Sequence, residues 1–149
     1  MDKRQMIPAA GLLATVVAAV YMVVQLSGQT ARPTADFTNA ALAEVRNAQG
    51  QAILSGQFRL VEEEDDDVER KAALVPTGIE ADATGEAEIE FSKSAPAEQE
   101  VEFSVRNVAP GAVLTFVIDG TDVATATADK TGRAEVELDV RMPGATASR

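Results

Sequence analysis

The sequence predicts a mainly β protein with one N-terminal transmembrane helix, a short amphipathic helix and then a small antiparallel β-sandwich. Residues 7–26 contain no charged side chain, and residues 36–50 have the composition of a helix. From residue 51 onward apolar and polar residues alternate with a period of two, which is typical of half-buried strands. At 149 residues the chain has room for about one domain.

Residues 7–26 are long enough to cross a bilayer. Twenty residues of helix span about 30 Å, which is the thickness of the hydrocarbon core. Lys3 and Arg4 lie just before this segment, within an expected cytoplasmic tip of residues 1–6. The positive-inside rule then places the later residues outside the cytoplasm. We therefore expect a bacterial inner-membrane protein with a cytoplasmic N-terminus and a periplasmic C-terminal domain.

The alternative for residues 7–26 is a cleaved signal peptide, which also has a basic start and an apolar middle. The apolar run is longer than is usual for a signal peptide. Residues 26–31 also offer no good cleavage site with small residues at the required spacing. We favour a retained anchor.

The expected transmembrane helix separates small from bulky side chains. Small residues let a second helix approach closely, and such packing drives association in lipid. The alternative is that an alanine-rich anchor is ordinary and its faces segregate by chance. We expect a packing face toward other transmembrane subunits, formed by Ala10, Gly11, Ala14, Thr15, Ala18 and Ala19.

Between the span and the β domain we expect a linker at residues 27–35 and a short amphipathic helix at residues 36–50. Asp36 or Thr38 can cap the start of this helix, and Gly50 suits its end. Its apolar stripe comprises Phe37, Ala41, Leu42 and Val45.

The β-sandwich is expected over residues 51–143, followed by a flexible tail at residues 144–149. Short alternating or apolar segments, separated by turn residues, indicate six to eight antiparallel strands. Gly56 is a candidate bulge within the first of these segments. The segments lie at residues 52–60, 72–75, 87–91, 101–105, 114–118, 123–128 and 134–140. The expected core includes Phe58, Ile89, Phe91, Phe103, Phe116 and Leu138.

Three stretches resemble the CHRD-like β domains of secreted bacterial proteins, over about 85 residues. These are Ala52-Ile53-Leu54-Ser55-Gly56, Ala83-Thr84-Gly85-Glu86-Ala87 and Val101-Glu102-Phe103-Ser104-Val105. Two turn-rich stretches, Val108-Ala109-Pro110-Gly111 and Val117-Ile118-Asp119-Gly120, are similar to repeats of extracytoplasmic sandwiches. The resemblance implies an extracytoplasmic sandwich. CHRD-like domains usually carry a histidine-containing stretch after the middle strands. This chain has no histidine, so no metal role carries over.

Composition argues against catalysis. The chain has no histidine, cysteine or tryptophan, so the commonest general base, the thiolate nucleophile and the usual transition-metal ligands are missing. Serine and threonine hydroxyls have no histidine to activate them. The alternating glutamates of residues 86–90 and 100–102 are interpreted as the solvated face of two strands rather than acid/base pairs. We expect no enzyme activity, no cofactor and no metal.

One acidic run stands out as a candidate docking patch, formed by Glu62, Glu63, Glu64, Asp65, Asp66 and Asp67. Six adjacent carboxylates cannot be buried unpaired, so we expect them in water at a hairpin tip. Three interpretations stay open: a solvated loop, a docking patch for a basic partner, and calcium binding. The run lacks the spaced ligands of a calcium loop.

The preferred function is a non-catalytic accessory subunit of a bacterial membrane complex. An energy-transducing complex, such as a photosynthetic reaction centre or respiratory complex, is a candidate host by analogy. There an acidic outer face would receive a basic electron carrier such as a cytochrome c. The alternative is a free-standing envelope protein that binds a basic partner, a cation or a cell-wall ligand. The net charge of −11 argues against nucleic acid as a partner.

Overall fold

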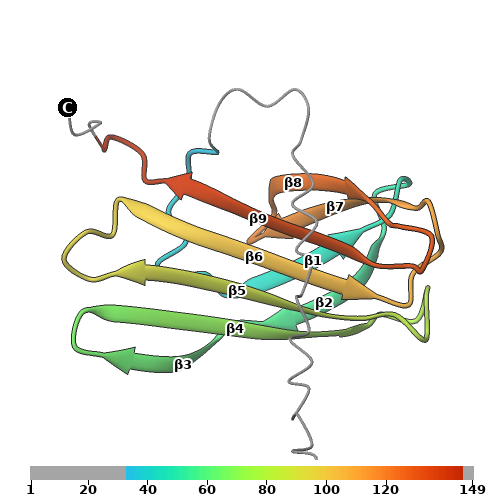
Figure 1. Cartoon of the computed structure of the whole chain (residues 1–149), viewed down its shortest axis with the longest axis horizontal. Helices are drawn as coiled ribbons and strands as arrows, with labels where there is room; N and C mark the ends of the chain where they lie inside the picture. Colours follow the sequence, from blue (N-terminus) through green and yellow to red (C-terminus); the bar gives the residue numbers. More distant parts are fainter. Residues whose placement is uncertain (1–32, 146–149) are drawn as a thin grey trace, which may run out of the picture.

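The computed structural model describes residues 33–145, and these form nine β-strands and no helix (Figure 1). The strands are β1 Leu42–Arg46, β2 Ala52–Gln57, β3 Arg59–Glu64, β4 Asp67–Pro76, β5 Thr84–Ser92, β6 Glu98–Arg106, β7 Val113–Ile118, β8 Thr121–Thr127 and β9 Ala134–Arg141. All pairings between them are antiparallel. The prediction of a mainly β, antiparallel domain is therefore confirmed.

The expected transmembrane helix and its packing face lie outside the described residues. Residues 33–145 contain no helix with the length and hydropathy needed to cross a membrane.

The strands form one curled, nearly closed sheet in the order β8-β7-β1-β2-β4-β5-β6-β9, with β3 paired to β4 beside this path. β4 connects two halves of this sheet: one contains β8, β7, β1 and β2, and the other contains β3, β5, β6 and β9. Its C-terminal residues Val75 and Pro76 pair with β2, while residues 67–71 pair with β3. In Figure 1, β1, β2, β7 and β8 lie behind β4, β5, β6 and β9. The inward side chains of both halves form one core.

Aromatic and branched side chains from both halves meet in this core. Phe103 of β6 and Phe116 of β7 are fully buried, and their ring centroids lie 5.0 Å apart. Phe58 and Ile89 are also buried, whereas Phe91 and Leu138 are half-buried and pack against the core. The predicted strand phase is thus confirmed for the five core positions that lie in strands, whereas Phe58 is buried between β2 and β3.

The predicted helix at residues 36–50 is wrong. Residues 42–46 form β1, which lies between β2 and β7 and pairs with both. Its buried residues are Ala43 and Val45, at the spacing of two that a strand requires. Pairing on both edges and burial in the core outweigh the helix propensity of alanine, leucine and glutamate. Asp36 does accept hydrogen bonds from Thr38, but these close a turn rather than a helix.

Gly50 lies in a hairpin turn rather than at the end of a helix. It has a φ of +77°, and its amide donates to the carbonyl of Asn47 at 2.9 Å. The side chain of Asn47 also accepts from the amides of Gln49 and Gln51 at 3.0 Å. These contacts form the turn between β1 and β2.

The bulge predicted at Gly56 lies elsewhere. Val45 pairs with Leu54 and Arg46 with Ala52, so Ile53 is the extra residue. Gly56 instead permits a close approach of two backbones, because a Cβ there would lie 2.2 Å from the carbonyl oxygen of Ala73.

The segment expected as one first strand divides at residue 58, where the chain leaves β2 and returns as β3. Residues 33–35 of the expected linker lie beside β9. The amide of Ala35 donates to the carbonyl of Arg141, and the amide of Arg141 donates to that of Pro33, both at 3.0 Å.

Candidate functional site

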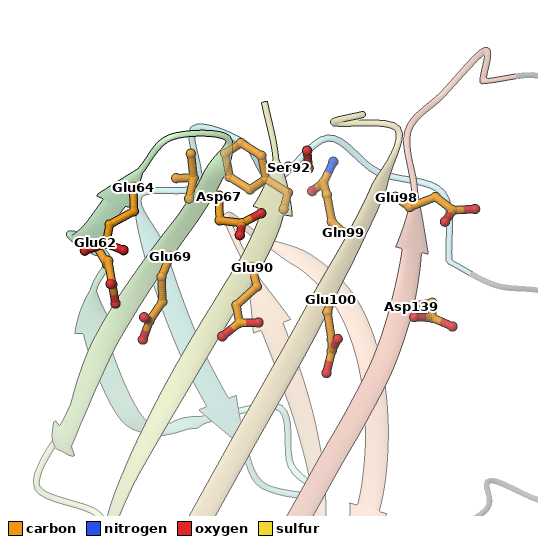
Figure 2. A pocket seen from close by; sticks show the side chains of 12 residues that line it. Glu62, Glu64, Asp67, Glu69, Glu90, Ser92, Glu98, Gln99, Glu100 and Asp139 are labelled. Carbon is orange, nitrogen blue, oxygen red and sulfur yellow. The ribbon is translucent and has the colours of Figure 1, made fainter. Parts of the chain in front are cut away.

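Acidic side chains form rows across five neighbouring strands. The outward residues of β3, β4, β5, β6 and β9 face each other directly, because the register aligns them pair by pair. The first row is Glu62, Glu69, Glu90, Glu100 and Asp139, and the second continues from Lys71 through Glu88, Glu102 and Glu137. Several of these carboxylates appear on one side of the sheet in Figure 2. We call this surface the acidic face: Glu62, Glu69, Glu88, Glu90, Glu100, Glu102, Glu137 and Asp139.

The crowding raises the pKa of several carboxyl groups on this face. Like charges directly opposite each other on neighbouring strands destabilise a sheet. A hydrogen bond with Glu88, partial desolvation and repulsion by nearby carboxylates together raise the pKa of Glu90 to about 7. Partial desolvation and the repulsion of Glu137 raise the pKa of Glu100, and partial desolvation with the repulsion of Glu88 raises that of Glu102. The face therefore holds protons more tightly than isolated glutamates do.

Lys71 partly neutralises the acidic face. Its Nζ lies 2.6 Å from a carboxylate oxygen of Glu69 and 3.1 Å from one of Glu88. These contacts raise the pKa of Lys71 well above its ordinary value. Oxygens of Glu69, Glu88 and Glu90 come within 4.8 Å of one another, a spacing that suits a cation. The lysine already contacts two of the three, so a metal ion would have to compete with it.

A groove of about 500 Å³ lies at the end of the acidic face near the β3–β4 turn (Figure 2). Its lining is mostly acidic, and it includes the partly buried Phe91 and the buried amide side chain of Gln99. The carboxylates in the lining are Glu62, Glu64, Asp67, Glu69, Glu90, Glu98, Glu100 and Asp139. Such a lining favours cationic ligands.

The acidic run lies at a hairpin tip, as predicted. Residues 62–64 end β3, Asp65 and Asp66 form the turn, and Asp67 begins β4. All six side chains are exposed. Glu62, Glu64 and Asp67 line the groove, whereas Glu63 forms an ion pair of 2.8 Å with Lys93. The run therefore divides between the groove and a second contact.

Asp66 ties this tip to the loop after β5, a role that the sequence did not reveal. Its carboxylate accepts hydrogen bonds from the hydroxyls of Ser92 and Ser94 and from the amide of Ser94, the last at 2.8 Å. The amide of Lys93 donates to the Asp66 carbonyl at 2.6 Å, and its Nζ donates to the Asp65 carbonyl at 3.2 Å. These hydrogen bonds lower the pKa of Asp66. Part of the acidic run is thus a structural clamp.

The sequence indicated the glutamates of β5 and β6 as solvated, but it did not show that β4 and β9 continue their rows. Glu69, Glu137 and Asp139 are the carboxylates that were missed. The alternation of residues 134–140 contains the signal for the last two. The neighbours of each strand come only from the sheet order.

No family model, curated protein or solved structure matches this chain. The resemblance to CHRD-like domains therefore remains an expectation.

Proposed function

We propose that this chain is a non-catalytic accessory subunit of a bacterial membrane complex. In this proposal residues 7–26 anchor it, and its extracytoplasmic β domain receives a basic soluble protein on the acidic face. The observation that carries the docking role is the row of five carboxylates aligned across five strands.

The size of the acidic face suits a protein partner. Neighbouring strands lie about 4.8 Å apart, so a row across five strands is about 20 Å wide. A standard protein interface covers about 800 Å² on each partner, so the two carboxylate rows would form the charged centre of such an interface rather than the whole of it. Clustered charge of one sign raises association rates with an oppositely charged partner. The groove beside Phe91 and Gln99 gives this surface a depression of about 500 Å³.

The non-catalytic part of the proposal has support from the polar groups around the groove. Asp66 contacts two serine hydroxyls, an arrangement that would otherwise suggest a base and a nucleophile. However, the pKa of Asp66 is lowered, so its carboxylate is a poor acceptor for a serine proton. The whole chain also lacks histidine and cysteine.

The membrane part of the proposal has support from residues 7–26, with their charge-free length and their small-residue face. An energy-transducing host with a cytochrome c as the basic partner fits the acidic face by analogy. Gentle detergent extraction followed by sizing and mass spectrometry tests this part. A subunit copurifies with defined partners, whereas a protein that always elutes alone is a free-standing envelope protein.

The docking role is tested with charge-matched variants of the full chain in detergent, with a strongly basic cytochrome c as the probe. The face variant combines Glu90→Gln, Glu100→Gln and Glu102→Gln. The control combines Glu80→Gln, Asp82→Asn and Asp122→Asn, which remove three carboxylates from the β4–β5 loop and from β8. Association is measured at about pH 8.5, above the raised pKa of Glu90, so that the two variants remove the same charge. We expect the face variant to associate roughly tenfold more slowly at low salt, with a flatter salt dependence, and the control to change little. Equal effects of the two variants would show that only net charge matters.

A further inference from the structure

We infer that the free edge of β3 binds an extended, positively charged segment of the partner, which adds to the sheet as a further strand. This inference deepens the proposed function, because it specifies how a basic partner is held after encounter. Strand addition of this kind obtains its affinity from main-chain hydrogen bonds and its specificity from alternate side chains.

Within the part of the chain that the structure describes, the edge of β3 is open. β3 pairs with β4 on one side, and no other strand among residues 33–145 pairs with it. All six of its residues are exposed. An open edge presents backbone N–H and C=O groups that another chain can use. By contrast, part of the β9 edge is covered by residues 33–35.

Two exposed apolar side chains on β3 favour association with another chain. Leu60 is 49% exposed and Val61 is 57% exposed. Val61 is also the residue skipped by the register, since Leu60 pairs with Arg70 and Glu62 with Glu69. Its backbone therefore has no register partner on β4. Exposed apolar residues on an open edge favour strand addition.

Charge selects the kind of segment that can add. Glu62, Glu63 and Glu64 end β3, and Asp65 to Asp67 follow directly. A second copy of β3 would bring carboxylates against carboxylates, so self-pairing is opposed. A segment that alternates lysine or arginine with apolar residues would neutralise Glu62 and Glu64, which form no ion pair within the described residues. The occupant is therefore a basic extended segment.

The edge is also held in place before binding. Asp66 is hydrogen-bonded to Ser92 and Ser94, and Glu63 is paired with Lys93. Both contacts fix the β3–β4 hairpin to the loop after β5. A preorganised edge loses less conformational entropy on binding.

The experiment uses the full chain in detergent and a synthetic peptide of alternating lysine and valine. A second peptide of the same sequence carries N-methyl groups on alternate residues, which removes main-chain donors and leaves the charge unchanged. We expect the first peptide to slow amide exchange in residues 59–64 and to bind at least tenfold more tightly than the N-methylated one. Equal affinities would overturn strand addition while leaving docking on the acidic face intact.

Variants at Val61 provide the matched test on the protein. Val61→Pro removes a backbone donor at the bulge, where proline is tolerated, and Val61→Ile keeps both this donor and an apolar side chain. We expect the proline variant to lose at least tenfold in affinity for the unmodified peptide, and the isoleucine variant to bind like the parent. Thermal unfolding of both variants checks that they fold, and the N-methylated peptide decides the question if the proline variant does not. Protection of residues 59–64 in a protein dimer without peptide would overturn the inference in favour of a second copy.

Discussion

Lowering the pH from about 7.5 to about 5 should stabilise the folded domain, because protonation of the acidic face reduces the repulsion between its carboxylates. The groups responsible are Glu90, Glu100 and Glu102, whose pKa values are raised in the folded state. Glu69, Glu88, Glu135, Glu137 and Asp139 repel them from the neighbouring strands. Lys71 contacts Glu69 and Glu88.

The sign follows from the protons bound in each state. Between pH 4.5 and about 7, folded Glu90 keeps a proton that it releases on unfolding, because its pKa is raised from 4.5 to about 7. Stability therefore falls as the pH rises through this window. The full shift in the pKa of Glu90 would correspond to about 3 kcal/mol of unfolding free energy. Glu90 is exposed, so screening by solvent reduces the expected gain to about 1 kcal/mol for the face as a whole.

Other carboxylates act in the opposite direction, but at lower pH. The pKa values of Glu63, Asp66 and Asp129 are lowered by hydrogen bonds and nearby cations. Their contribution is present above the unfolded values of 4.5 and 3.8 and is lost as the pH falls through the lower folded values. The window between about pH 5 and 7.5 thus reports mainly the acidic face.

The assay is urea unfolding followed by circular dichroism at several pH values in this window, in the parent and in the combined Glu90→Gln, Glu100→Gln and Glu102→Gln variant. We expect the unfolding free energy of the parent to decrease by about 1 kcal/mol from pH 5 to pH 7.5, and that of the variant to change less. A parent whose stability is constant or increases with pH would refute the reasoning. So would a variant that keeps the full pH dependence.

Four further predictions test the core, the tip, the topology and the anchor. Phe103→Ala should cost about 3–5 kcal/mol of unfolding free energy by leaving a cavity, and a cost below about 1 kcal/mol would contradict the packing against Phe116. Asp66→Asn removes the charge that accepts three hydrogen bonds, so amide exchange at residues 65–67 and 92–94 should accelerate while the core stays protected. Exchange that stays slow would show that the clamp does not order the tip. Protease added to intact spheroplasts should remove the residues after Arg32, and full protection would contradict the periplasmic location. Replacing Ala14 and Ala18 together with leucine should reduce copurification of partners, and stoichiometric copurification would show that this face is not the contact.

Alternation in the sequence predicted the strands well where one face is buried and the other is solvated. In β5 and β6 the buried positions Ala87, Ile89, Val101 and Phe103 alternate with glutamates. The two-residue period there leaves one possible inward face. The position of the acidic run at a hairpin tip was also predicted, for a different reason: unpaired carboxylates cannot be buried.

Two kinds of feature could not be predicted from the sequence. The first is a strand whose local composition favours a helix, since β1 is specified by pairing with β2 and β7 rather than by its own residues. The second is any feature that depends on register between distant segments. The clamp joins Asp66 to Ser92 and Ser94, and nothing in either stretch alone indicates the other. The carboxylate rows arise in the same way.

The distribution of charge between the two halves of the sheet distinguishes docking from general solubility. Strands β1, β2, β7 and β8 contain only three charged residues, and two of these, Glu44 and Arg46, pair with each other at 2.7 Å, leaving Asp122. The outward positions of that half are otherwise uncharged, as at Ser55 and Thr115. A requirement for solubility alone would spread charge over both halves. Eight carboxylates gathered on one half instead create a directed field. This one-sided distribution supports the proposal of a partner that approaches from one side, and the charge-matched variants measure that asymmetry.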